Sequence, residues 1–217
     1  MYRSYFTSIK LSAIIKISRR DRVEELEIEF KNLIEYAVYD RLRSTYFKEA
    51  EVITQTNFYI DTKNNAIQSH RIALRIRDTG DSLMMTLKVP QTVGTMEYHG
   101  TINPALLDEE VIDPAEIPDN IRQQLEERRI PVDSLYIVGA LSTERREISY
   151  KGGLLVLDAS RYLDAEDYEL EYEVSDYDHG LEIFESFLNQ QGITSRKPLN
   201  KIQRFYARHA MLTSKSL

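Results

Sequence analysis

The segment Glu24-Glu-Leu-Glu27-Ile-Glu29-Phe-Lys31 alternates charged and apolar side chains. Because successive side chains of an extended strand point to opposite faces, this period of two predicts a strand with one apolar face. The other face carries Glu27, Glu29 and Lys31. The pattern therefore indicates a strand whose second face is entirely charged.

Strand-type alternation recurs along the rest of the chain. Short turns such as Thr79-Gly80-Asp81 separate neighbouring segments, which is typical of hairpins and antiparallel pairing. The further predicted strands are Val52 to Asp61, Arg71 to Asp78, Ser82 to Val89, Thr95 to Ile102, Leu135 to Tyr150, Leu154 to Asp158 and Tyr168 to Val174. About eight strands joined mainly by hairpins favour an antiparallel sheet closed into a barrel.

Four segments have the apolar spacing of helices. The first runs from Leu33 to about Phe47, with Asn32 as its expected N-cap. The others are Pro114 to Arg128, within an acidic surface insertion, Gly180 to Gln191, and Lys201 to Met211. We therefore expect an α+β fold, an eight-stranded antiparallel closed β-barrel that forms a tunnel, with helices packed outside it.

The chain of 217 residues is long enough for one domain with a sizeable core and contains no linker-like stretch. We expect a single domain over residues 23–212, followed by a tail over 213–217. Residues 1–22 are interpreted as an N-terminal extension that arises from the choice of start site. Codons for Arg19-Arg20 can form a ribosome-binding sequence, and Val23 can be encoded by a GTG start codon.

Composition narrows the classes of function. The formal net charge of -7 disfavours a general nucleic-acid-binding protein, which usually presents a basic face. The absence of cysteine excludes disulfides and thiolate metal sites, so a metal would need oxygen or imidazole ligands. The sequence contains no run of about 18 apolar residues, so it predicts no membrane-spanning helix. We expect a cytoplasmic protein with no nucleic-acid or membrane partner, and the sequence leaves a homodimer open.

Charged residues on the polar strand faces are segregated by strand. They are Glu27 and Glu29; Arg75 and Arg77; Glu169, Glu171 and Glu173; and Lys88, Arg145 and Asp158 on separate strands. One hypothesis is an open sheet whose charged face is solvated, with cross-strand ion pairs of roughly 0.2–1 kcal/mol each. The alternative is a closed barrel in which these charges converge. That arrangement requires a ligand, because buried charges must be neutralised by metals and anions.

The order of these motifs resembles that of the CYTH superfamily, the triphosphate tunnel metalloenzymes, which include class IV adenylate cyclases and thiamine triphosphatases. Glu27-Ile-Glu29-Phe-Lys31 is similar to the family's ExExK signature. The later blocks are Gln55-Thr-Asn57-Phe-Tyr59-Ile-Asp61-Thr, Leu74-Arg75-Ile-Arg77, Thr86-Leu-Lys88, the Arg145 strand, Glu169-Leu-Glu171-Tyr-Glu173, and Lys201 before Arg204-Phe-Tyr. The match covers about Glu25 to Tyr206 and is most similar to a Gram-positive bacterial branch often labelled adenylate cyclase.

The resemblance implies a tunnel that holds a linear triphosphate beside Mg²⁺ or Mn²⁺. The implied metal ligands are Glu27, Glu29, Glu171 and Glu173. The residues implied to bind phosphate oxygens are Lys31, Arg75, Arg77, Lys88, Arg145 and Lys201. Lys31, Lys88 and Asp158 are the implied catalytic residues, with Asp158 orienting a metal-bound water. Arg145 is preferred to Arg146, since only one of two neighbours on a strand can face inward.

Three functions are compatible with such a site. The first is metal-dependent hydrolysis of a triphosphate compound, either inorganic tripolyphosphate or a nucleoside triphosphate, which makes the chain a triphosphatase. The alternative is an adenylate cyclase that makes cyclic AMP from ATP with the same metals. The third is a non-catalytic sensor of polyphosphate or nucleotides. Hydrolysis of tripolyphosphate is favoured because a charge-lined tunnel needs no pocket for a base.

Overall fold

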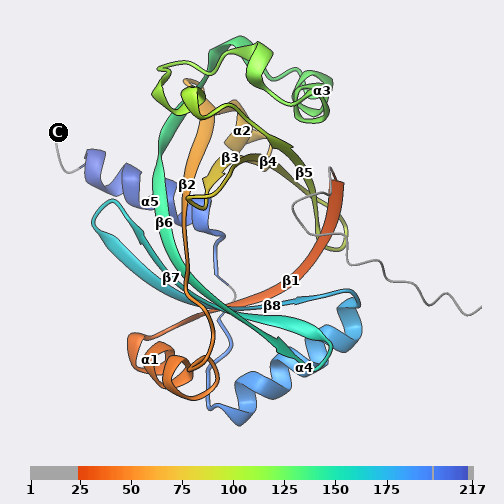
Figure 1. The fold of residues 1–217 in the computed structure, drawn as a ribbon, viewed down its shortest axis with the longest axis vertical. Helices are drawn as coiled ribbons and strands as arrows, with labels where there is room; N and C mark the ends of the chain where they lie inside the picture. Colours follow the sequence, from red (N-terminus) through yellow and green to blue (C-terminus); the bar gives the residue numbers. More distant parts are fainter. Residues whose placement is uncertain (1–23, 197, 215–217) are drawn as a thin grey trace, which may run out of the picture.

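The computed structural model describes residues 24–196 and 198–214, and within these ranges eight strands close into a barrel. Neighbouring strands are antiparallel throughout and follow the order β1-β5-β4-β3-β2-β6-β7-β8 (Figure 1). The strands are β1 (Glu24–Ile34), β2 (Ile53–Thr62), β3 (Ala73–Asp78), β4 (Leu83–Pro90), β5 (Thr95–Thr101), β6 (Leu135–Tyr150), β7 (Gly153–Tyr162) and β8 (Ala165–Val174). The predicted closed antiparallel barrel is confirmed, and the open-sheet hypothesis is wrong.

Helices cover the outside of this barrel, as expected. The α-helices are α1 (Tyr36–Thr45), α2 (Ala66–Ser69), α3 (Asp119–Glu127), α4 (Tyr177–Gln190) and α5 (Lys201–Ser214). Three short 3₁₀ helices, η2 (Pro104–Asp108), η3 (Pro114–Glu116) and η4 (Val132–Ser134), lie with α3 in the insertion between β5 and β6. The insertion lies on the opposite side of the barrel from α1 and α4 (Figure 1). In the described part of the chain, no helix has the length and apolar character needed to cross a membrane.

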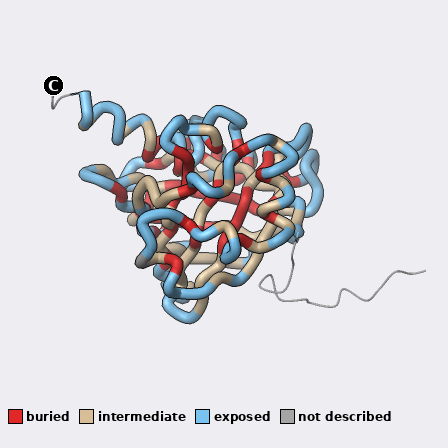
Figure 2. The backbone as a smooth tube through the Cα atoms, turned by 90° about the horizontal axis from the view of Figure 1, so that it is seen from above, coloured by how far each residue is buried: buried red, intermediate tan, exposed pale blue. Residues whose placement is uncertain are grey.

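Two apolar clusters hold the helices against the outer face of the barrel. In the first, Leu74 and Leu87 of β3 and β4 pack with Ile121 and Leu125 of α3. In the second, strand residues of β7 and β8 pack with α1 and α4, and its members include Leu155, Leu157, Leu170, Tyr172, Leu42, Phe184 and Phe187. Each such side chain stabilises the fold by roughly 1.5–3 kcal/mol when buried. Buried segments follow the strands, whereas helices and turns carry most of the exposed residues (Figure 2).

The first predicted helix was wrong at its start. β1 continues through Leu33 and Ile34, which pair with Glu169 and Tyr168 of β8, and α1 begins at Tyr36. Asn32 is therefore not an N-cap. Its amide nitrogen donates to the Thr194 carbonyl at 3.1 Å, and its side-chain oxygen accepts from the Arg196 backbone N–H. A contact with a segment more than 160 residues away replaces the local cap that the sequence predicted.

Other boundaries also differ from the predictions. β7 continues past Asp158 to Tyr162, because it remains paired with β8 as far as the Tyr162–Ala165 pair. The predicted helix over Pro114 to Arg128 is divided into η3 and α3. The expected N-terminal extension lies outside the described residues. α5 extends to Ser214, two residues into the expected tail.

α5 packs against side chains of β2, β6 and β7 and thereby brings the C-terminal residues to the barrel. Ile202 and Phe205 of α5 contact a small cluster that includes Tyr59, Leu141 and Tyr162. The Phe205 ring lies over Gly139 of β6, where a Cβ atom would be only 2.4 Å from the ring. Glycine at this position thus permits the close approach of α5.

We expect Gly139→Ala to destabilise the fold by about 1–3 kcal/mol, because the added methyl group overlaps the Phe205 ring and forces α5 outward. Chemical denaturation followed by circular dichroism measures the change. Ala140→Ser on the same strand is the matched control, since Ala140 is exposed, and it should alter stability by no more than about 0.5 kcal/mol. Equal stability of Gly139→Ala and the wild type would contradict this account of α5 packing.

Candidate active site

The barrel encloses a cavity of about 900 Å³ whose wall carries both carboxylates and cationic side chains. It is lined by residues of all eight strands and of α5. The site residues expected from the sequence that line it are Glu27, Glu29, Lys31, Arg75, Arg77, Lys88, Arg145, Glu171, Glu173 and Lys201. Arg146 faces the other way and donates to the Tyr39 hydroxyl at 2.9 Å, so Arg145 is the inward-facing arginine of β6.

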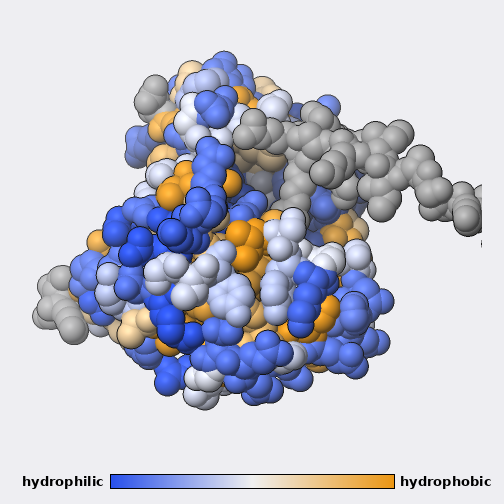
Figure 3. Space-filling view, turned by 60° about the horizontal axis from the view of Figure 1, so that its bottom comes forward, coloured by the Kyte–Doolittle hydropathy of each residue, from blue (hydrophilic) through white to orange (hydrophobic). Residues whose placement is uncertain are grey.

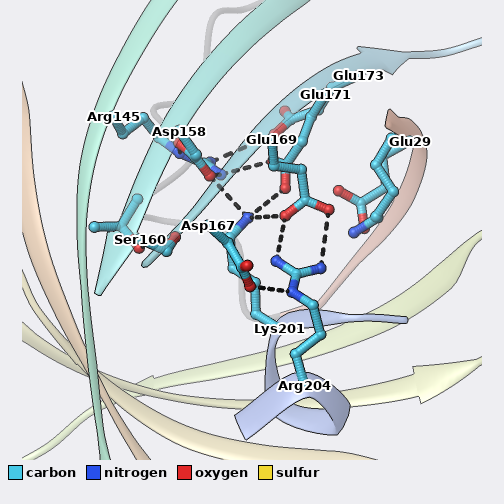
Figure 4. Close-up of polar contacts among 12 residues, drawn as sticks. Glu29, Arg145, Asp158, Ser160, Asp167, Glu169, Glu171, Glu173, Lys201 and Arg204 are labelled. Atoms are coloured by element: carbon cyan, nitrogen blue, oxygen red, sulfur yellow. Dashed lines mark hydrogen bonds and ion pairs between the residues drawn. The ribbon is translucent and has the colours of Figure 1, made fainter. Parts of the chain in front are cut away.

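Arg145 is the centre of an ion-pair network on the β6–β8 side of the cavity (Figure 4). Its Nε and Nη2 donate to the two carboxylate oxygens of Asp158 at 2.9 and 2.7 Å. Nη2 also donates to Oε2 of Glu171 at 2.7 Å. Asp158 has no exposed surface, so it lies behind Arg145 rather than on the cavity wall. Bidentate pairing of this kind fixes both position and orientation of the guanidinium group.

Lys201 extends the same network from the first residue of α5. Its Nζ contacts Asp158 Oδ2 at 2.8 Å, Glu169 Oε2 at 2.9 Å and Glu171 Oε1 at 2.5 Å. Arg204, one helical turn later, donates to Glu169 Oε2 at 2.9 Å and to Asp167 Oδ2 at 2.8 Å. α5 is therefore attached to β7 and β8 by buried ion pairs as well as by apolar packing (Figure 4).

The pKa shifts in this network reflect competition between burial and pairing. Burial alone would raise the pKa of Asp158 and Glu171, but Arg145 and Lys201 lower the pKa of both carboxyl groups below their ordinary values. Burial alone would lower the pKa of the two cations, yet the surrounding carboxylates raise it. All four side chains are therefore charged at neutral pH.

A second network lies on β1, β4 and β5. Lys88 Nζ donates to Glu27 Oε2 at 2.7 Å and also forms an ion pair with Glu97. Burial alone would lower the pKa of Lys88, but these two carboxylates raise it. His99 contributes Nε2, 3.4 Å from Glu97 Oε2, and its Nδ1 lies 3.0 Å from the Thr86 hydroxyl. Lys31 of β1 forms a separate pair with Glu29.

Glu97 and His99 were not predicted as site residues, although both line the cavity. The sequence did contain a signal for Glu97. It shares a strand face with His99, and the β4–β5 hairpin places it directly opposite Lys88. Counting residues back from the hairpin turn would have paired a predicted phosphate-binding lysine with this carboxylate. Glu169 and Arg204 were also outside the predicted set and belong to the Lys201 network.

The two arginines of β3 are the exception to this pairing. Within the described residues, neither Arg75 nor Arg77 forms an ion pair with a carboxylate. Arg77 Nε donates to the neutral Asn57 Oδ1 at 3.1 Å, and the buried Arg75 Nε has no hydrogen-bond partner among them. Burial, together with Arg75 and Arg145, lowers the pKa of Arg77 to about 9, so the group is still charged at neutral pH. Two unneutralised cations in a cavity wall favour an anionic ligand.

The carboxylates of the cavity have the chemistry of a site for a hard divalent cation. Glu29 of β1 and Glu173 of β8 are direct cross-strand partners, an arrangement in which like charges repel unless a cation lies between them. Among the described residues, however, no group of three or more Asp, Glu or His side chains converges into a metal site. Glu27, Glu29 and Glu171 are instead held by lysine or arginine. A metal would therefore have to replace these cationic groups.

Comparison with known proteins identifies the family. The model of the CYTH domain matches residues 25–206, which is nearly the whole described chain. The chain belongs to the CYTH domain family. A protein of Bacillus subtilis (strain 168), named "Putative triphosphatase YjbK", is 38% identical over 187 residues, which are 84% of this chain and 95% of that protein.

Solved structures have the same fold. A "putative adenylate cyclase" from Bacillus halodurans is 34% identical, and the alignment covers 85% of this chain and 100% of that one with a TM-score of 0.77. The Hippeastrum protein HpAC1 is 23% identical, with 84% and 96% of the two chains covered and a TM-score of 0.70. It is described as a "putative adenylyl cyclase" that reveals a dominant triphosphatase activity. Membership of the CYTH family implies dependence on a divalent metal ion, and the carboxylate set on β1 and β8 is chemically suited to one.

The pairing of Asp158 generates a prediction about stability and pH. We expect Asp158→Asn to destabilise the fold at pH 7 by about 3–5 kcal/mol, because Arg145 and Lys201 lose the charge of a buried partner. The ordinary pKa of this carboxyl is 3.8 and its folded pKa is lower, so its ionised form stabilises the fold above about pH 4. That stabilisation is lost as the pH falls further, and the difference between variant and wild type should then narrow.

Urea denaturation between pH 7 and pH 2.5 measures this difference. Asp40→Asn is the matched control, because Asp40 pairs with Arg43 on the surface and both side chains are nearly half exposed. It should change stability by less than about 1 kcal/mol at every pH. A constant difference between Asp158→Asn and wild type across the pH range would show that the charge of Asp158 does not stabilise the network.

Proposed function

We propose that this CYTH protein hydrolyses a triphosphate compound in the barrel cavity with the help of divalent metal ions. The observation that carries the proposal is the pair of unneutralised arginines, Arg75 and Arg77, in the same enclosed cavity as the carboxylates of β1 and β8. Anionic phosphate oxygens match the arginines, and a hard cation matches the carboxylates. Both groups are needed for metal-assisted phosphoryl transfer.

Each set of residues has a distinct role in this proposal. Glu27, Glu29, Glu171 and Glu173 are the proposed ligands of Mg²⁺ or Mn²⁺, which would polarise phosphate oxygens and activate the attacking water. Arg75 and Arg77 bind phosphate oxygens and neutralise the charge that grows on the leaving phosphate. Arg145 and Lys201 are held by carboxylates of β7 and β8 in the same cavity, where they can contact further phosphate oxygens.

Lys31 and Lys88 are proposed to change partners when metal and substrate bind. In the structure, Lys31 forms an ion pair with Glu29 and Lys88 forms one with Glu27, and both carboxylates are proposed metal ligands. A metal at those carboxylates would release both ammonium groups toward the phosphates. Asp158 was expected to orient a metal-bound water, but its complete burial behind Arg145 and Lys201 favours a role in holding those two cations.

Tripolyphosphate is the substrate that requires the fewest assumptions, because a charged wall recognises phosphates without a pocket for a base. The 38% identical relative named as a triphosphatase supports hydrolysis. Adenylate cyclase activity is the alternative, because a 34% identical relative is described as a "putative adenylate cyclase". In that reaction the ribose hydroxyl of ATP attacks the α-phosphorus. A non-catalytic sensor would use the same cationic groups for binding alone.

Phosphorus NMR of tripolyphosphate and of ATP, each incubated with the protein and Mg²⁺ or Mn²⁺, tests the three functions together. We expect orthophosphate to appear only when a divalent metal is present, and EDTA to stop its release. Formation of pyrophosphate and cyclic AMP from ATP would show that the protein is an adenylate cyclase and not a hydrolase. Unchanged spectra combined with measurable binding of tripolyphosphate would establish the sensor instead.

Substitutions in the cavity give a separate prediction. Arg75→Ala and Glu29→Ala should each lower turnover at least 100-fold while the circular dichroism spectrum and cooperative unfolding persist, because both side chains line a ligand cavity. Arg146→Ala is the matched control, since this arginine lies on β6 outside the cavity. It should retain turnover within about twofold. Wild-type turnover in either cavity variant would exclude catalysis in the barrel.

A further inference from the structure

The strand register shows which cationic side chains of the cavity lie opposite a carboxylate. Three of the cations stand directly opposite a carboxylate on a neighbouring strand: Lys31 opposite Glu171, Lys88 opposite Glu97, and Arg145 opposite Asp158. The β3 arginines have neutral neighbours on both sides. Arg75 lies between Tyr59 and Thr86, and Arg77 lies between Asn57 and Met84. The neutral flanks therefore coincide with the two arginines that have no ion pair in the described part of the chain.

Asn57 is the neutral neighbour that contacts its arginine. Its side chain is almost fully buried, and its Oδ1 accepts a hydrogen bond from Arg77 Nε at 3.1 Å. An aspartate has nearly the same shape and would accept the same hydrogen bond. It would also add a negative charge, as Asp158 does for Arg145. Asparagine thus orients the Arg77 guanidinium without neutralising it.

The two cross-strand neighbours of Arg75, Tyr59 and Thr86, are also uncharged, and each contacts another residue. The Thr86 hydroxyl is taken up by His99, with 3.0 Å between its oxygen and Nδ1. Tyr59 is buried, and its ring packs against Phe205 with 5.9 Å between the centroids. Neither residue supplies a charge to Arg75. Burial and the neighbouring arginines lower the pKa of Arg77, and neither β3 arginine is paired with a carboxylate in the described part of the chain.

We infer that Asn57 is a positioning residue that holds Arg77 for a polyphosphate and keeps its charge available, and that its neutrality determines the affinity for this ligand. The inference rests on the proposed function, because it assigns the anion held by Arg77 to a substrate phosphate. It goes beyond that function by assigning a role to a residue that touches no reacting atom.

Two variants of Asn57 separate this role from a structural one. Asn57→Asp keeps the shape and the hydrogen bond but neutralises Arg77, whereas Asn57→Ala removes the hydrogen bond and leaves the charge. A purely structural role makes aspartate the milder change in every measurement. The inferred role makes aspartate the more harmful change for ligand affinity, even though its ion pair with Arg77 makes the fold more stable than that of Asn57→Ala.

Titration calorimetry with tripolyphosphate in EDTA measures the affinity without metal, and steady-state assays with Mg²⁺ give kcat and KM. We expect Asn57→Asp to weaken tripolyphosphate binding by about 10- to 100-fold, as for the loss of one charge-assisted contact, and to raise KM accordingly. Asn57→Ala should weaken binding by less than about fivefold. Thermal unfolding should give a higher Tm for Asn57→Asp than for Asn57→Ala.

Gln55→Glu is the matched control for added charge. Gln55 is a buried residue of β2 on the same cavity wall, two positions from Asn57, and it makes no hydrogen bond with Arg77. It should weaken binding less than Asn57→Asp does. Equal losses in these two variants, or binding by Asn57→Asp that is as tight as by Asn57→Ala, would overturn the inference alone. A wild-type protein that does not bind tripolyphosphate would remove the proposed function itself.

Discussion

The structure depends on one constraint, which is that ionised side chains inside a closed barrel must be neutralised. Each buried ion costs several kcal/mol in lost hydration, and a partner of opposite charge offsets that cost only when the geometry is good. The barrel meets this constraint by placing acidic and basic residues on neighbouring strands, so that Arg145 meets Asp158 and Lys88 meets Glu97. Apolar side chains are then assigned to the outer face, where the helices cover them. The molecular surface is accordingly mostly hydrophilic, with small and scattered apolar areas on the face shown in Figure 3.

The same constraint joins the site to the C-terminal helix. Lys201 is surrounded by three carboxylates of β7 and β8, and Arg204 also pairs with one of them, Glu169. Removing α5 would leave Glu169 buried without Lys201 and Arg204, and would leave Asp158 and Glu171 with Arg145 alone. The contact of Phe205 with Gly139 and the ion pairs of Lys201 and Arg204 together hold α5 against the barrel. The helix is therefore part of the cavity wall as well as of the core. The cavity wall is therefore complete only with α5 in place.

Side-chain alternation predicted which residues share one face of a strand, because parity is a local property. Alternation left open whether that face meets solvent or the inside of a barrel. The resemblance to the CYTH family placed Glu27, Glu29, Arg75 and Arg77 in the cavity, and they do line it. Parity does not say which residue stands opposite, so the pairing of Lys88 with Glu97 was missed. Long-range contacts were also beyond local patterns. Asn32 was assigned to a helix cap because its neighbours suggested one, but its amide contacts Thr194. Burial of Asp158 behind two cations depends on three strands and α5 together, and no single segment contains that information.

The lysines of the cavity are paired with carboxylates, whereas the β3 arginines are not. This difference affects how one site can bind both a metal cation and an anionic phosphate. Carboxylates paired with lysine are occupied sites for a cation, so a divalent metal that binds them displaces the ammonium groups, which then need a new anionic partner. Among the described residues, the arginines of β3 have no carboxylate partner to give up, so an anion that reaches them adds a new interaction. If the lysines released from Glu27 and Glu29 then turn toward that anion, each ligand lowers the cost of binding the other. Paired and unpaired cations in one wall thus favour joint binding of metal and polyphosphate over binding of either ligand alone.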